Sequence, residues 1–326
     1  MSSERRVRVS AGTAVVLGLS SARVDARPTT AYLMTGVEDG CLYDCAFCAR
    51  ARSAKGRSDA LSRVTWPEWP EDEVFARLVR AHDDEVLKRA CFQVVRTKDY
   101  IDDICRRVRL LASYGELSVC VSANLRSSAE VARLLEVGVD RVSIPIDAAS
   151  PAVYARVKGG SWHGTLELLR ECARKFPGRI TTHIIIGLGE SEEDAVSLIG
   201  SLTDEGIMTA LFAFTPVRGT RLEGAKPPDI TSYRKIQAAR YLLDRGLVRV
   251  SQMTFVDGVL TDFGLDRATL LEVLADGEAF RTSGCPDCNR PYYNERPGGV
   301  IYNYPEPLTE AQREEALAQL AGGLSR

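Results

Sequence analysis

The chain has 326 residues, a formal net charge of −2, 45% hydrophobic and 26% charged residues. This length fits one large domain or two ordinary ones, and the balanced charge argues against an extensive nucleic-acid interface. No stretch reaches the roughly 18 apolar residues that would span a membrane, so we expect a cytoplasmic protein without a membrane or nucleic-acid partner. Nine cysteines in such a chain favour thiol or metal chemistry over disulfides.

Strand-like and helical stretches alternate along the first two thirds of the chain. Strands are predicted at 32–36, 91–95, 117–121, 141–146, 179–186 and 209–214, and helices at 72–82, 99–114, 128–137, 163–175 and 191–203. This alternation predicts an α/β fold made of βαβ units with a parallel sheet. Six such units indicate a full or partial TIM-type barrel, whose active site lies on the loops after the strands.

The pattern changes after Pro216. We predict a helix at 232–245, a strand at 247–251 and a terminal helix at 312–320, and the segment from about residue 280 is rich in Gly, Pro, Tyr and Asn. The predicted organisation is therefore an N-terminal extension (1–30), a β/α barrel (31–279) and an irregular C-terminal tail (280–326).

Three cysteines, Cys41, Cys45 and Cys48, lie on the loop after the first predicted strand with the spacing C-x3-C-x2-C. Three thiolates hold three corners of a four-iron, four-sulfur (4Fe-4S) cube and leave the fourth iron open. A structural zinc site takes four ligands, and none completes this loop nearby. A zinc loop and three unrelated core cysteines are the alternatives.

The tail carries a second cysteine motif, C-x2-C, at Cys285 and Cys288. Such a turn is half a zinc site, half a cluster site or a redox pair. Cys91 and Cys120 lie on neighbouring predicted strands and could face the barrel interior, although free cysteines are also common in ordinary cores. We hypothesise that these four residues hold a second iron–sulfur cluster. Cys105 and Cys172 lie on predicted helices and are interpreted as structural.

The first motif, with Phe47 just before its last cysteine, resembles the signature of the radical S-adenosylmethionine (radical SAM) enzymes. The resemblance implies that Cys41, Cys45 and Cys48 are the catalytic ligands of a 4Fe-4S cluster. SAM binds the open iron and is cleaved to a 5′-deoxyadenosyl radical. Phe47 would back the adenine, or else simply pack in the core.

Two further segments resemble the biotin synthase branch of that family. His183 to Glu190 resembles the fifth-strand motif G-x-I-x-G-x-x-E, with His183 in place of the first glycine. The resemblance implies that His183, Ile185, Gly187 and Glu190 contribute to SAM binding; a plain strand that ends in a glycine turn is the alternative. Asp147 resembles the acidic position that bonds the SAM ribose, and a turn or helix N-cap is its alternative.

The auxiliary cluster expected from this branch matches only in part. Cys91 and Cys120 resemble the first two ligands of the biotin synthase auxiliary cluster. The third is expected near Thr181, which is not a cysteine, and Arg249 matches the arginine ligand only loosely.

The tail from Thr282 to Gly299 resembles instead the two-protein lipoyl synthases found largely in archaea. This resemblance implies sulfur insertion at carbons 6 and 8 of an octanoyl chain on a carrier-protein lysine. It also implies three partners: an octanoylated lipoyl carrier protein, a paralogous radical SAM subunit, and an electron donor such as ferredoxin or flavodoxin. A biotin-synthase-like enzyme, another radical SAM enzyme on a small molecule, and a non-enzymatic metal-binding scaffold are the alternatives.

Overall fold

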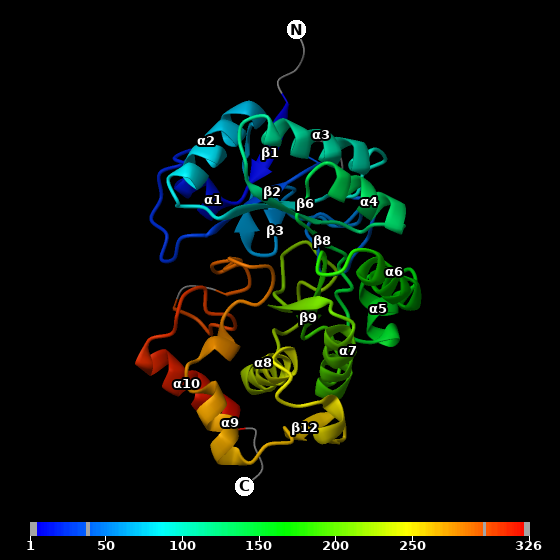
Figure 1. Cartoon of the computed structure of the whole chain (residues 1–326), viewed down its shortest axis with the longest axis vertical. Coiled ribbons are helices and arrows are strands. Elements are labelled where there is room, and N and C mark those ends of the chain that lie inside the picture. The colour runs from blue at the N-terminus through cyan, green and yellow to red at the C-terminus, as the bar shows by residue number, and fades with distance from the viewer. Residues whose placement is uncertain (1–4, 37–39, 296–297, 323–326) are drawn as a thin grey trace.

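The structure is a computed structural model that describes residues 5–36, 40–295 and 298–322 (Figure 1). Its centre is an eight-stranded sheet with the strand order β10-β9-β8-β7-β6-β2-β1-β5. The strands are β1 (Arg6–Val9), β2 (Thr30–Met34), β5 (Glu68–Pro70), β6 (Arg89–Gln93), β7 (Ser118–Ser122), β8 (Arg141–Ser143), β9 (Ile180–Ile186) and β10 (Met208–Ala213). Positions 1–4 and 323–326 of the predicted extension and tail, and 296–297 of the tail motif, lie outside the described residues.

The six strands from β2 to β10 pair in parallel, and β1 pairs antiparallel with both β2 and β5. The predicted α/β barrel is therefore confirmed in its partial form, because the sheet is open between β10 and the β2 side. β1 belongs to the main sheet although it lies within the predicted N-terminal extension.

Helices connect the parallel strands and cover one face of the sheet. They are α2 (Glu71–Asp83), α3 (Tyr100–Ala112), α4 (Ser128–Glu136), α5 (Pro151–Val157), α6 (Trp162–Lys175) and α7 (Glu192–Asp204). Ser127, Ser161 and Ser191 cap the starts of α4, α6 and α7 by accepting backbone N–H groups. Short elements, α1 (Ala11–Val16) and the strand pair β3 (Ala60–Leu61) and β4 (Val64–Thr65), complete this part.

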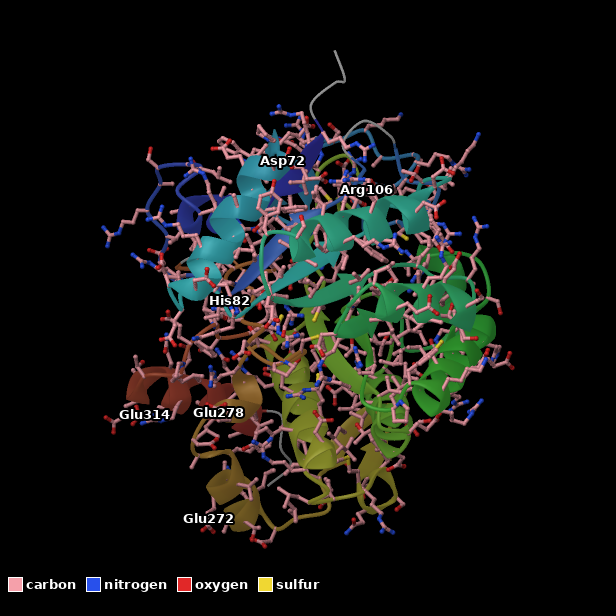
Figure 2. The ribbon with its side chains drawn as sticks, turned by 45° about the horizontal axis from the view of Figure 1, so that its top comes forward. Asp72, His82, Arg106, Glu272, Glu278 and Glu314 are labelled. Atoms are coloured by element: carbon pink, nitrogen blue, oxygen red, sulfur yellow. The ribbon has the colours of Figure 1, made fainter. Side chains whose placement is uncertain are left out.

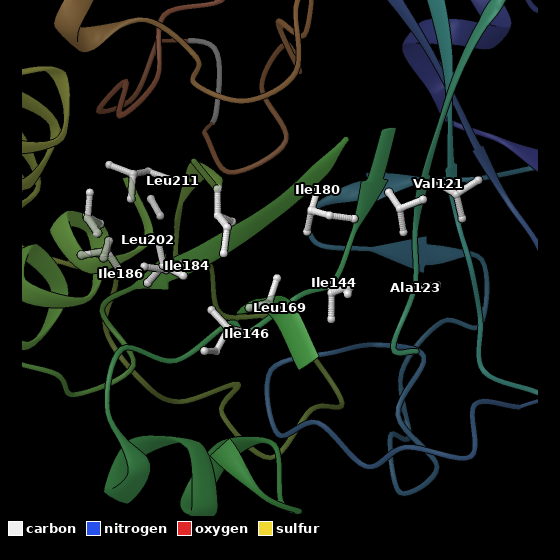
Figure 3. Packing of buried hydrophobic residues seen from close by; sticks show 14 of the residues in the cluster. Val121, Ala123, Ile144, Ile146, Leu169, Ile180, Ile184, Ile186, Leu202 and Leu211 are labelled. Carbon is white, nitrogen blue, oxygen red and sulfur yellow. The ribbon is translucent and has the colours of Figure 1, made fainter. Parts of the chain in front are cut away.

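Strand alternation separates the core from the functional face. Ile184 and Ile186 are buried toward the helical layer near Leu202 (Figure 3). His183 and Ile185 have the opposite parity in the same strand, are only partly buried, and therefore face the barrel interior. The predicted fifth-strand motif is thus divided between a packing face and a site-facing face.

The C-terminal third begins with α8 (Ile230–Asp244), followed by η1 (Val250–Gln252), the hairpin β11 (Thr254–Val256) and β12 (Val259–Asp262), α9 (Arg267–Leu274), η2 (Glu278–Phe280) and α10 (Glu310–Ala321). No helix of the described chain is long and apolar enough to cross a bilayer.

The predicted strand at 247–251 is wrong, since this segment is a loop that leads into η1. Its alternating apolar residues satisfy a turn instead of a sheet. Val248 is buried, and Val250 packs on α7 where Gly200 leaves space; a Cβ there would lie 2.3 Å from the Val250 side chain.

The irregular tail bridges the open side of the sheet. The Thr30 hydroxyl donates to the Asp287 carbonyl at 2.9 Å, next to the start of the first parallel strand. On the last parallel strand, the Leu211 amide donates to the Ser283 hydroxyl at 2.9 Å. In Figure 1 this orange segment lies between the β2–β3 region and α8. The tail therefore joins β2 to β10, which do not pair with each other.

Arg234 of α8 anchors the part of the tail that follows. Its guanidinium donates to the Ile301 and Tyr302 carbonyls, both at 2.6 Å, and to the Gln319 side chain of α10 at 2.9 Å. The side chain is fully buried, so each of these acceptors would lose its partner without it.

We expect Arg234→Met to lower the free energy of unfolding by about 3 kcal/mol, because it leaves buried carbonyls unsatisfied. Urea unfolding followed by circular dichroism measures the change. Arg267→Met, at an exposed position of α9, is the matched control and should change stability by no more than about 0.5 kcal/mol. Equal effects of the two substitutions would refute the anchoring role.

Candidate active site: two cysteine groups in one barrel

The first cysteine group, Cys41, Cys45 and Cys48, lies on a loop fixed by backbone hydrogen bonds to other loops of the barrel. The Leu42 amide donates to the Arg96 carbonyl at 2.8 Å, after β6, and the Ala46 amide donates to the Val157 carbonyl at 2.6 Å, at the end of α5. The loop therefore has a defined position over the carboxyl ends of the strands.

These three cysteines line one small cavity, of about 140 Å³, which we call the inner cavity. Phe47, Asp147 and His183 line it as well. Its other walls come from the ends of β2, β6 and β7, namely Met34, Gln93 and Ser122. The site thus lies at the carboxyl ends of the parallel strands, where barrels of this type carry their active sites.

The thiols of this group combine burial with hydrogen-bond donors. The amides of Tyr43 and Arg50 donate to the sulfurs of Cys41 and Cys48, each at 3.4 Å. Burial raises the pKa of all three thiols, and that of Cys48 reaches about 11. A metal deprotonates a coordinating thiol outright, so such thiols are suited to a bound metal rather than to free nucleophilic chemistry.

The donor set fits a cluster better than a single ion. Across residues 5–36, 40–295 and 298–322, no three His, Cys, Asp or Glu side chains converge closely enough to hold one metal ion. A 4Fe-4S cube takes each thiolate on a different iron, so its ligands surround a cavity without meeting at a point. Three thiols around the inner cavity have that arrangement.

Asp147 lies beside the first group in a buried charge network. Its carboxylate pairs with the Lys158 ammonium at 2.7 Å and with His183 Nε2 at 2.8 Å. Burial raises the pKa of Asp147, but Lys158 and His183 outweigh this effect and hold the pKa below its usual range. Asp147 also has a φ of +61°, a left-handed conformation that Asp tolerates better than most residues. Both carboxylate oxygens are engaged, so a ligand hydroxyl would share them with Lys158 and His183.

The other residues of the fifth-strand motif build a turn. The Glu190 carboxylate accepts the Gly187 amide at 2.6 Å and the Leu188 amide at 3.0 Å. Gly187 has a φ of +102°, and a Cβ there would lie 2.8 Å from Pro228. Gly187 and Glu190 therefore shape the chain after β9, while His183 presents its ring to the inner cavity.

The second cysteine group, Cys91, Cys120, Cys285 and Cys288, combines two strands with the tail. Cys91 and Cys120 are direct register partners on β6 and β7. The tail brings Cys285 into a hydrogen bond with Cys120, and Cys91 interacts electrostatically with both tail thiols. The structure therefore brings together all four residues of the hypothesised second site.

Polar side chains surround this second group. Arg89 Nη1 donates to Cys120 Sγ at 2.8 Å, and Gln93 Nε2 donates to Cys91 Sγ at 3.2 Å. The Tyr32 hydroxyl lies 3.4 Å from Cys288 Sγ. The hydrogen bond with Cys120 lowers the pKa of Cys285, whereas burial raises that of Cys91.

The tail supplies what the strands lack. Thr181, where the resemblance to biotin synthase expects a third cysteine, hydrogen-bonds through its side chain to Cys285. The expected arginine does not match, because Arg249 lies exposed at the start of η1 while Arg89 contacts Cys120. Cys285 thus reaches the expected position from a different part of the chain.

One aromatic cluster, made of Tyr32, Met34, Trp66, Val95 and Tyr293, lies between the two cysteine groups. Cys41 of the first group and Cys91 and Cys288 of the second pack against it. The Tyr32 and Tyr293 ring centroids lie 5.0 Å apart, and those of Trp66 and Tyr293 lie 5.9 Å apart. The two groups therefore share a common buried apolar wall.

Other metal-binding side chains lie away from these groups. Cys105 and Cys172 are buried in the helical core, in keeping with a structural role. His82 lies on α2 in the outer helical layer (Figure 2), where its ring bonds the Leu87 carbonyl at 2.9 Å.

Several site residues were not found from the sequence. Lys158, Arg89, Gln93 and Tyr293 belong to no motif and reach the site through tertiary packing. A buried lysine near an aspartate is not recognisable from spacing alone.

Comparison with known proteins agrees with this geometry. Residues 37–202 match the family model of the Radical SAM superfamily. A biotin synthase of Synechococcus sp. (strain JA-3-3Ab) is 27% identical over 216 residues, which cover 65% of this chain and 68% of that protein. A biotin synthase of Bordetella avium (strain 197N) is 29% identical over 225 residues, with 65% of each protein covered.

Two solved structures share the fold. The FeFe-hydrogenase maturase HydG superposes with a TM-score of 0.53 at 13% identity, covering 66% of this chain and 50% of HydG. Methylornithine synthase (PylB) superposes with a TM-score of 0.51 at 14% identity, covering 67% of this chain and 63% of that protein. At these identities the superpositions speak for the fold alone, and the match spans only half the length of HydG.

We expect anaerobic reconstitution with iron and sulfide to load two clusters, one on each cysteine group. Cys45→Ala should lose the iron and sulfide of the first cluster, and Cys285→Ala/Cys288→Ala those of the second, because each cluster needs its own thiolates. Cys172→Ala is the matched control and should bind as much iron as the parent protein. An iron content of about one cube per chain that Cys285→Ala leaves unchanged would disprove the second cluster.

We expect Asp147→Asn to lower the free energy of unfolding by about 3–5 kcal/mol, because it leaves the buried Lys158 ammonium without an anionic partner. Urea unfolding measures this loss. The double variant Asp147→Asn/Lys158→Met removes both charges and should be more stable than the single variant. A double variant less stable than the single one would contradict this account.

Proposed function

Because this chain belongs to the radical SAM superfamily, we propose that it is a sulfur-inserting enzyme that acts on unactivated carbon atoms. The observation that carries the proposal is the second cysteine group, which packs on the same aromatic cluster as the first. A radical enzyme needs only the first group to generate its radical. Four more thiols beside the same buried space support a second, sulfur-bearing cofactor.

The residues present fit the two groups that this function requires. Cys41, Cys45 and Cys48 would hold a 4Fe-4S cluster that binds SAM, and Cys91, Cys120, Cys285 and Cys288 would hold the auxiliary cluster. When bound, the first cluster and SAM supply the radical that removes hydrogen from the substrate, and the second supplies sulfur.

The chain itself provides enclosure and orientation. Tyr32, Trp66 and Tyr293 are buried and line the space between the two groups, which would keep water from the reacting carbon. Gln93 lines the inner cavity and also donates to Cys91, so it positions a thiol of the second group from the wall of the first. The ion pair with Lys158 fixes Asp147, which in turn fixes the His183 ring.

Within this class we propose a lipoyl synthase subunit, with an octanoyl chain on a carrier-protein lysine as its substrate. The resemblance of the tail to the two-protein lipoyl synthases supports this choice, and so does the use of Cys285 in place of a cysteine at Thr181. The proposed partners are the octanoylated lipoyl carrier protein, a paralogous radical SAM subunit, and a ferredoxin or flavodoxin as electron donor.

A biotin-synthase-like sulfurtransferase, or another radical SAM enzyme acting on a small molecule, is the second candidate. The 27% identity to a biotin synthase over 65% of this chain favours it. The departure at Thr181 argues against biotin synthase itself, because one strand ligand of that enzyme's auxiliary site is missing here.

We expect the reduced, reconstituted protein, with or without its paralogue, to cleave SAM and to convert an octanoyl-lysyl peptide to a thiooctanoyl or lipoyl product. Mass spectrometry of the peptide and chromatography of 5′-deoxyadenosine measure the two steps. Cys288→Ala should keep SAM cleavage but form no sulfur-containing product, since it removes only a ligand of the second group; Cys172→Ala is the control.

Two results would contradict this function at different levels. Absence of 5′-deoxyadenosine from both preparations would refute the radical SAM activity as a whole. SAM cleavage with no sulfur added to the peptide would refute the lipoyl assignment and favour a small-molecule substrate.

A further inference from the structure

A second cavity, of about 1120 Å³, lies outside the aromatic cluster, and we call it the outer cavity. Its walls come from the loop after the first cysteine group, the loop after β10, and the tail. It adjoins the inner cavity closely: Leu61 lines the inner cavity, and the next residue, Ser62, lines the outer one. The Ser62 hydroxyl donates to the Tyr293 carbonyl at 2.7 Å, so the aromatic cluster forms part of the partition.

The outer cavity is rich in cations. Those that line it are Lys55, Arg57, Arg63 and Arg218, and the carboxylates among its described lining residues are Glu223 and Glu295. Glu223 accepts the Gly219 amide at 2.6 Å, and Glu295 accepts the Asn303 amide at 2.9 Å. Both carboxylates are therefore used to hold loop backbone rather than to pair with the cations across the cavity.

Lys55 and Arg218 are held next to each other by their backbones. The Lys55 amide donates to the Gly219 carbonyl at 2.8 Å. Gly56 approaches so closely that a Cβ there would lie 2.3 Å from the Arg218 carbonyl oxygen. Both side chains are exposed, and neither forms an ion pair within the described part of the chain.

Two adjacent cations repel each other unless an anion joins them. The chain as a whole carries a net charge of −2, so this local excess of positive charge does not follow from its composition. A cavity of this kind attracts acidic groups and suppresses the binding of neutral or basic ones.

We propose that the outer cavity binds carboxylate side chains of the acyl-carrying protein, close to its modified lysine. This inference rests on the proposed function, because it assigns the partner surface for an octanoyl-lysyl arm. The arm would pass by Leu61 and Ser62 toward the inner cavity while the acidic segment stays outside. Lys55 and Arg218 would then set the choice of partner and take no part in the chemistry.

The test is a binding measurement that needs no turnover. Two fluorescent octanoyl-lysyl peptides are compared by anisotropy, one with Asp and Glu beside the lysine and one with Asn and Gln at the same positions. We expect the reconstituted protein to bind the acidic peptide about five- to tenfold more tightly, and added salt to reduce this preference.

Three variants locate the source of that preference. Lys55→Glu/Arg218→Glu should abolish it, and Lys55→Gln/Arg218→Gln should weaken it. Arg109→Glu/Arg267→Glu makes the same change of charge on the outer helices, at exposed positions, and should retain it. The amount of 5′-deoxyadenosine formed without peptide should be the same in all of them.

Several outcomes would overturn the proposal. Equal affinity for the two peptides, or an equal loss of preference in the Arg109→Glu/Arg267→Glu control, would show that the outer cavity does not select acidic segments. No binding of either peptide would show that the occupant is not an acyl-lysyl protein segment. Binding with the expected preference but without sulfur insertion would support the docking site and contradict the lipoyl synthase assignment, so the two proposals fail separately.

Discussion

An open parallel sheet leaves one strand edge without a partner, and in this molecule the C-terminal tail covers it. Ser283 accepts the Leu211 amide of β10, and Arg290 donates to the Leu211 carbonyl at 3.3 Å, so the tail satisfies edge groups that a closed barrel would pair. The same segment bonds Thr30 beside β2. Closure of the fold and assembly of the second cysteine group are therefore one event, because the residues that seal the seam carry Cys285 and Cys288.

Burial gives the two ends of the site different chemical characters. At the carboxyl ends of the strands, the first three thiols are uncharged in their buried state, and an Asp147–Lys158 pair supplies fixed charges close by. Deeper in the barrel, Arg89 and the Cys120–Cys285 hydrogen bond favour a negative sulfur. The aromatic cluster separates these environments without polar groups that would compete for a reactive carbon.

The sequence predicts much of this arrangement where the signal is local. Strands and helices of the barrel follow from apolar periodicity, and both cysteine motifs follow from spacing. The strand predicted at 247–251 fails because Val248 and Val250 are buried by a turn against α7 rather than by a sheet. Lys158 and Arg89 could not be found, since their roles depend on partners that only the fold brings near. Contact between Cys285 and Thr181 likewise joins distant segments that no local pattern relates.

The position of the tail has a consequence for how such a protein matures in the cell. During synthesis, the loop with Cys41, Cys45 and Cys48 and the strands around it emerge long before Cys285 and Cys288. A growing chain can form most of the barrel while its seam is still open and its second group is half complete. Loading of the two cysteine groups is thus ordered in time by the direction of translation, and the second must wait for the finished polypeptide.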